Sequence, residues 1–205
     1  MKALLIVLAL GGLVAAGFSG TAVDPSCLRD GPEYIGADGC KKCHFTQWMR
    51  WKKTEMAKAF DSLKPGEAAE AKAKHGLEAT KDYTKDATCV ACHVTGYGKP
   101  GGYPAIEEGK TWSAEEAERA KSMEGVQCES CHGPGSQTAP FKKDNEQYKK
   151  ADVLKLGMVE PNAENCAQCH NSKNPTAGDD YKLDYEALTK DDKKIHKHKK
   201  LKYEH

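Results

Sequence analysis

Four short stretches of this sequence place two thiols and an imidazole in the pattern Cys-x-x-Cys-His. The two cysteines of such a stretch can add to the vinyl groups of a haem, and the adjacent histidine can bind its iron. Eight of the nine cysteines belong to these stretches, which we call the first to fourth motifs. The pattern predicts four covalently bound haems c. The attachment residues are Cys40, Cys43 and His44; Cys89, Cys92 and His93; Cys128, Cys131 and His132; and Cys166, Cys169 and His170.

Zinc sites and disulfides are the other common uses of paired cysteines. A zinc site built from four cysteines, or from two cysteines and two histidines, does not require a histidine at one offset after every pair. Disulfides form in oxidising compartments, but they have no use for that histidine either. The repeated histidine therefore favours haem. Cys27 lies outside the pattern, and we expect it to be a free or intermolecular thiol.

The N-terminus predicts export. Residues 1–22 begin Met-Lys, continue as an apolar run from 3 to about 18, and end in Gly20-Thr-Ala22, a small-x-small cleavage site. This arrangement is typical of a secretory signal peptide, so the predicted mature domain comprises residues 23–205 in the periplasm or another exported location. The apolar run is shorter than the roughly 20 residues of a spanning helix. We therefore expect no stable membrane span after cleavage.

The composition is too polar for an ordinary hydrophobic core. Mean hydropathy is -0.72 and aromatic residues make up only 7% of the chain. We expect the haems to supply the missing apolar surface, and the protein without haem to be largely unfolded. The charges nearly balance, with 31 Lys and Arg against 30 Asp and Glu, and nothing in the sequence indicates nucleic-acid binding.

Hydrophobic periodicity predicts helices between and after the motifs, and no strand of any length. Ser113 and Glu116 form a capping-box pattern at the start of one of them. A loop rich in glycine and proline, residues 96–103, follows the second motif. The expected helices span residues 45–63, 67–77, 113–123, 142–156 and 183–203.

Several long stretches of the sequence resemble the tetrahaem cytochrome c-554 family. The resemblance implies a small multihaem cytochrome c fold, mainly α with almost no strand, in which helices and loops wrap round four packed haems. It also implies periplasmic electron transfer. The stretches that carry it are residues 54–65, 81–85, 89–98, 101–103 and 125–135.

The resemblance further implies distal histidines on three haems and an open, five-coordinate iron at His93. One distal histidine of the family, twelve residues after the first motif, reaches the third haem; Met56 stands at that position here. Met56 then either binds the iron of the His132 haem through its sulfur, which would raise the potential, or packs against the porphyrin. Another distal histidine lies in the C-terminal helix and reaches the fourth haem; His196 matches it.

The remaining distal histidine of the family follows the third motif and reaches the first haem. In this chain no histidine occurs between His132 and Cys166, so the distal ligand of the His44 haem stays open. The candidates are His75, His198, His205, Lys142 or water.

The function predicted from these residues is an exported tetrahaem carrier that passes single electrons between redox partner proteins rather than an enzyme. A second hypothesis is an enzyme that reduces nitric oxide, or a related nitrogen oxide, at the open iron of His93. A third is a subunit of an extracellular cytochrome filament, joined through histidines such as His198 or His205. The sequence identifies neither the electron donor nor the acceptor.

Overall fold

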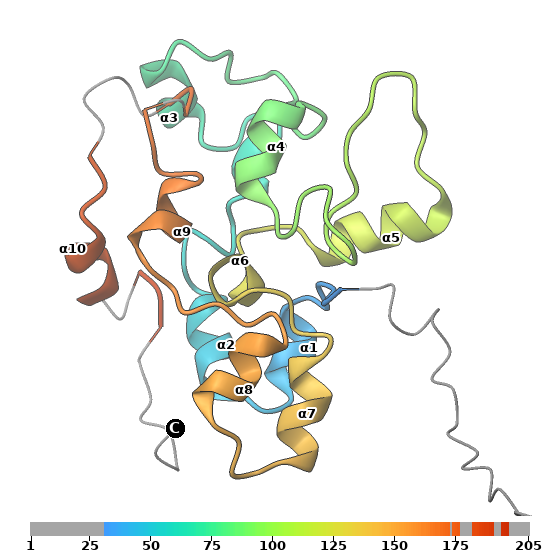
Figure 1. Ribbon diagram of the computed structural model, residues 1–205. Helices are drawn as coiled ribbons and strands as arrows, with labels where there is room; N and C mark the ends of the chain where they lie inside the picture. Colours follow the sequence, from blue (N-terminus) through green and yellow to red (C-terminus); the bar gives the residue numbers. More distant parts are fainter. Residues whose placement is uncertain (1–30, 173, 177–181, 191–193, 197–205) are drawn as a thin grey trace, which may run out of the picture. The chain divides into compact units, whose positions relative to one another are not determined.

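The structure is a computed structural model that describes residues 31–172, 174–176, 182–190 and 194–196 (Figure 1). The chain divides into residues 1–30 and residues 31–205, and all described residues belong to the second unit. The predicted signal peptide, Cys27, His198 and His205 lie outside the described residues. Within the described part, no helix has the length and apolar character needed to cross a membrane.

Short helices joined by longer loops make up the described part of the chain, which contains no strand. The one pairing of extended backbone there is an isolated antiparallel bridge between Val94 and Glu124. The predicted mainly-α fold class is therefore confirmed. The elements are α1 (Ala37–Lys41), α2 (Phe45–Trp51), η2 (Asp61–Leu63), α3 (Ala69–Lys74), α4 (Ala87–His93), α5 (Ala114–Ser122), α6 (Cys128–His132), α7 (Thr138–Asp144), α8 (Lys150–Lys155), α9 (Ala163–Ala167) and α10 (Tyr185–Lys190).

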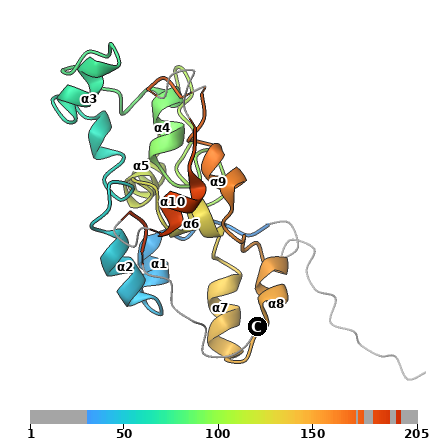
Figure 2. The same ribbon diagram turned by 90° about the vertical axis from the view of Figure 1, so that its left-hand side faces the viewer.

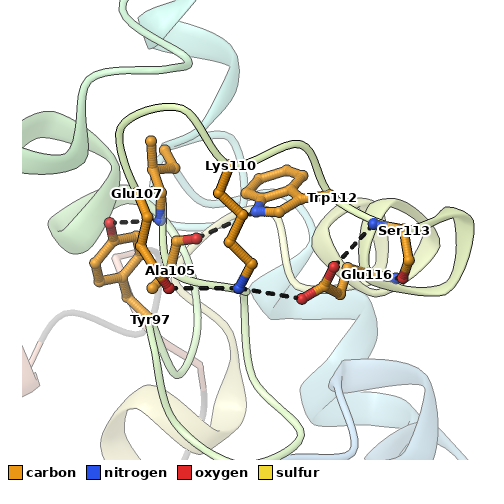
Figure 3. A network of polar contacts seen from close by, with 8 residues as sticks. Tyr97, Ala105, Glu107, Lys110, Trp112, Ser113 and Glu116 are labelled. Atoms are coloured by element: carbon orange, nitrogen blue, oxygen red, sulfur yellow. Dashed lines mark hydrogen bonds and ion pairs between the residues drawn. The ribbon is translucent and has the colours of Figure 1, made fainter.

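The start of α5 is the clearest local prediction that the structure confirms. The Ser113 hydroxyl accepts a hydrogen bond from the Glu116 N–H at 3.1 Å, and the Glu116 carboxylate accepts one from the Ser113 N–H at 2.8 Å. Lys110 extends this capping box, because its ammonium lies 3.4 Å from Glu107 and 3.5 Å from Glu116 (Figure 3). The loop before α5 is thus fastened to the first turn of the helix.

The single helix expected over residues 45–63 is wrong, because α2 ends at Trp51. The Trp51 indole N–H donates to the Val126 carbonyl at 2.8 Å, and the Val126 N–H donates to the Met56 carbonyl at 2.8 Å. These bonds tie the segment to the residues just before the third motif. The backbone therefore leaves the helix to make tertiary contacts that hydrophobic periodicity does not reveal.

Two further helix predictions need correction. The helix expected over residues 142–156 is two helices, α7 and α8, and Asn145 ends the first by donating both its backbone N–H and its side-chain amide to Phe141 O, at 3.0 and 2.9 Å. In the tail, α10 accounts for only part of the helix expected over residues 183–203, and residues 194–196 are not helical. The helix expected over residues 67–77 is confirmed as the shorter α3.

A hydrophobic cluster surrounds α4, the helix of the second motif. Val90 on this helix is 0% exposed, and Met123 at the end of α5 is 2% exposed. Cys89 packs against the cluster as a partly buried residue. The second motif is therefore embedded in protein side chains. The buried members of the cluster are Phe60, Leu63, Tyr83, Val90, Val94, Tyr103, Ala120 and Met123.

The glycine-rich loop after the second motif folds onto Tyr34. The Tyr34 N–H donates to the Pro100 carbonyl at 3.0 Å. Gly101 has a φ of +71°, and a Cβ on it would collide with the Tyr34 backbone oxygen. Glycine is required at this position because the two segments of the chain approach so closely.

Candidate functional site

Each Cys-x-x-Cys-His motif forms one helical turn. Helix α4 holds the second motif and α6 the third. In the other two motifs the histidine N–H donates to the carbonyl of the first cysteine, from His44 to Cys40 at 3.0 Å and from His170 to Cys166 at 2.9 Å. Residues three and four apart lie on one face of a helical turn. The two thiols and the imidazole of each motif can therefore face the same porphyrin.

The cysteine thiols bring together motifs that are not consecutive in the chain. The thiols of Cys40 and Cys128 lie close enough to interact, which raises the pKa of Cys40 and lowers that of Cys128. Those of Cys92 and Cys169 interact in the same way, which lowers the pKa of Cys92 to about 7 and raises that of Cys169. The first motif therefore adjoins the third, and the second adjoins the fourth.

Helix α6 links these two pairs of motifs. It contacts α1, which carries Cys40, and α9, which carries Cys166 (Figures 1 and 2). Burial raises the pKa of the Cys131 thiol to about 11, and the charge of Cys166 contributes to the same shift. The four motifs thus lie in the spatial order first, third, fourth, second.

The imidazole of His93 is held in the tautomer that iron binding requires. Its Nδ1 lies 2.6 Å from the Ala59 carbonyl oxygen and 3.2 Å from the Ser62 hydroxyl. A carbonyl only accepts hydrogen bonds, so Nδ1 carries the proton and Nε2 keeps its lone pair for a metal. Such a second hydrogen bond is the usual support of a metal-binding histidine. This arrangement fits haem ligation by His93.

Glu129, between the two cysteines of the third motif, is a buried carboxylate with 3% exposure. It accepts hydrogen bonds from the N–H groups of Ile35 at 3.0 Å, Gly36 at 2.7 Å and Gly135 at 2.7 Å. Burial raises the pKa of Glu129, and these three hydrogen bonds oppose the rise. Gln127 accepts from the next N–H, that of Ala37, at 2.6 Å. Together they fasten the start of α1 to the third motif.

The donor set suits a haem better than a bare metal ion. In the part of the chain that the structure describes, no group of three or more His, Cys, Asp or Glu side chains is placed to hold an ion. A haem needs only axial ligands from the protein and thiols at its edge. The four motifs offer both.

The structure places both predicted distal residues, Met56 and His196, near the third motif. Met56 is half-buried, and its carbonyl bonds to Val126 just before that motif; ligation through its sulfur stays a prediction. The ring of His196 lies beside that of His132, with centroids 6.2 Å apart and planes inclined by 23°. The resemblance assigned His196 to the fourth haem instead.

Two candidates for the distal ligand of the His44 haem lie within the described residues. His75 is exposed and caps the C-terminus of α3. Lys142, on α7, is half-buried with its ammonium 5.0 Å from the centre of the Tyr148 ring. The interaction with Cys128 and burial raise the pKa of Cys40, and the charge of Lys142 partly opposes that rise. Lys142 is therefore near the first motif.

Sequence reasoning missed three groups that support the motifs: Glu129, the Ser62 hydroxyl and the Ala59 carbonyl. A glutamate between the two cysteines of a haem motif could have drawn attention, because a charge there must be exposed or hydrogen-bonded. A backbone carbonyl has no signal in the sequence. Only the tertiary structure reveals its role.

Comparison with known proteins agrees with this geometry. The family described as "Cytochrome c554 and c-prime" matches residues 39–133. A relative, cytochrome c-554 of Nitrosomonas europaea, is 34% identical over 213 residues, which cover 93% of this chain and 86% of that protein. A solved structure, the reduced state of cytochrome c554 from Nitrosomonas europaea, superposes with a TM-score of 0.70 at 31% identity. It covers 86% of this chain and 91% of that one.

Proposed function

The chain belongs to the cytochrome c-554 family, and on this premise we propose that it is an exported carrier of single electrons with four covalently bound haems c. Membership of the family makes it a c-type cytochrome of electron transfer. The proposal goes beyond family membership in four points: the number of haems, their attachment residues, export, and the role as a carrier between partner proteins.

The convergence of the four motifs is the observation that carries the proposal. Thiols from motifs far apart in the chain lie close enough to shift each other's pKa, as Cys40 does with Cys128 and Cys92 with Cys169. Haem c, when bound, supplies one-electron chemistry at its iron. The chain contributes covalent anchors, an axial imidazole from each motif, and the close spacing of the anchors.

The spatial order of the motifs suggests the route of the electrons. Neighbouring anchors run from the first motif through the third and fourth to the second. An electron that enters near His44 would therefore leave near His93, or the reverse. On this proposal the two partner proteins dock at opposite ends of the series, close to α1 and to α4.

The intact mass of the exported protein tests haem number directly. We expect four haems per chain, and an N-terminus at Val23 if the predicted signal peptide is removed after Ala22. The Cys27→Ser variant serves as a control, because Cys27 lies outside the motifs and its replacement should leave the haem content at four. A wild-type mass with fewer than four haems would contradict the proposal.

A carrier can be distinguished from an enzyme by adding nitric oxide to the reduced protein. We expect at most a stable adduct and no continued consumption of the gas. Consumption over many turnovers would favour the alternative, nitric oxide reduction at the iron of His93. That alternative and filament assembly both stay predictions of the sequence.

A further inference from the structure

His132 and His196 come from distant parts of the sequence, yet their imidazole rings lie close together. His132 ends α6 and belongs to the third motif, whereas His196 follows α10. Their ring centroids are 6.2 Å apart, and the planes are inclined by only 23°. The pair lies where the third motif would hold its haem.

The separation of the rings matches two imidazoles on opposite sides of one metal ion. A metal binds an imidazole nitrogen at about 2.0 Å, and that nitrogen lies about 1.1 Å from the ring centre, so two trans rings have centroids about 6 Å apart. Offset packing of two aromatic rings covers centroid separations of about 4.5–7 Å, so the variants described below distinguish iron ligation from direct packing. The observed spacing leaves room for an iron between them.

The chain before His196 is anchored close to the third and fourth motifs. The Tyr185 hydroxyl, at the start of α10, donates to the Pro161 carbonyl at 2.9 Å, just before α9. Burial raises the pKa of Tyr185, and the charges of Cys166 and Cys131 contribute to the same shift. The segment that carries His196 therefore starts beside both motifs, and its length allows His196 to reach either haem.

Met56 is the competing ligand for the same iron. Its carbonyl accepts from the Val126 N–H at 2.8 Å, which places the residue beside the third motif. That contact fixes the backbone and does not orient the sulfur. For His196, in contrast, the imidazole ring itself is placed, with its centroid 6.2 Å from that of the His132 ring.

From this geometry we infer that His196 is the distal axial ligand of the third haem, trans to His132. The inference rests on the proposed attachment of a haem at the third motif. It moves His196 from the fourth haem to the third and leaves Met56 as a packing residue. Two imidazole ligands also give a lower reduction potential than an imidazole and a thioether, since methionine ligation favours ferrous iron.

Three single variants of the four-haem protein test the inference by spectroscopy. In His196→Ala, electron paramagnetic resonance should show one additional high-spin ferric haem, and added imidazole should restore the low-spin signal. Met56→Ala should keep the wild-type near-infrared spectrum. Lys194→Ala is the matched control from the same segment and should resemble wild type. A near-infrared thioether band that is present in wild type and lost in Met56→Ala would overturn the inference, as would an unchanged spectrum in His196→Ala.

The haem that responds must also be identified. When Cys166 and Cys169 are both replaced by Ala to remove the fourth haem, the His196→Ala substitution should still produce the new high-spin signal. Disappearance of that signal would assign His196 to the fourth haem and refute the inference.

If this variant does not accumulate, a crystal structure of the wild-type protein decides. The His196 nitrogen should lie about 2 Å from the third iron, and any other placement refutes the inference. Because the haem count comes from the intact mass, these outcomes are distinct from failure of the proposed function.

Discussion

The surroundings of the second motif differ from those of the third. Around α4, buried apolar side chains such as Val90 and Met123 form a cluster of the kind found in any small globular protein. Around α6 the buried groups are polar, with Glu129 and Gln127 accepting hydrogen bonds from the start of α1. One region is stabilised by apolar packing, and the other by hydrogen bonds and, on our proposal, by haem.

This difference refines the expectation that the protein without haem is unfolded. The apolar cluster gives the second motif a source of stability that comes from the chain itself. The third motif contacts both α1 and α9 and, on our proposal, would rely more on the haem for its stability. We therefore expect the two regions to respond differently when a haem is removed.

The largest effect should come from removing single haems. Replacing Cys128 and Cys131 by Ala should abolish folding of the region around α6 or lower its melting temperature strongly. On our proposal, α6 holds a haem between α1 and α9, its two neighbours, and the double replacement would remove that haem. Replacing Cys89 and Cys92 by Ala should remove one haem and leave a folded three-haem protein. Thermal melting and intact mass measure both outcomes. Equal loss of stability in the two variants would contradict the comparison.

A cavity in the apolar cluster should have the next largest effect. Met123→Ala removes a side chain that is 2% exposed and should lower the free energy of unfolding by about 2–5 kcal/mol. Leu154→Ala, at a side chain that is 40% exposed, is the control and should change it by less than about 0.5 kcal/mol. Thermal or denaturant unfolding measures the difference. Similar values for both would mean that the cluster does not stabilise the fold.

Disruption of the polar contacts at the third motif should cost somewhat less. Glu129→Gln replaces a carboxylate oxygen with an amide NH₂ that faces N–H donors, and should destabilise the protein by about 2 kcal/mol. Glu118→Gln, on the exposed face of α5, is the matched control and should be nearly neutral. Unfolding curves of the two variants provide the test. A neutral Glu129→Gln would show that these hydrogen bonds do not hold α1 to α6.

The smallest effect should be at the start of α5, where the capping box is exposed to solvent. Ser113→Ala removes the hydroxyl of the capping box and should cost about 1 kcal/mol. Haem content and absorption spectra should stay those of wild type, because no motif contributes to this box. A spectral change on this substitution would mean that α5 influences the haem sites.

Local features of the sequence were predicted well, because their physics involves neighbouring residues. The capping box of Ser113 and Glu116 needs only residues three apart, and the structure confirms it. The helix over residues 45–63 was predicted wrongly, since the Met56 carbonyl accepts from the Val126 N–H and the Trp51 indole donates to the Val126 carbonyl. Periodicity cannot register a partner that is distant in the chain.

The sequence by itself determined the chemistry of each motif. Two thiols and an imidazole at fixed spacing lie on one face of any helical turn, whatever surrounds it. Only the tertiary structure decided which motifs are neighbours and which side chain lies beside His132. The contacts between Cys40 and Cys128, between Cys92 and Cys169, and between His132 and His196 join residues far apart in the chain. Such pairings depend on how the whole chain packs, so local spacing carries no record of them.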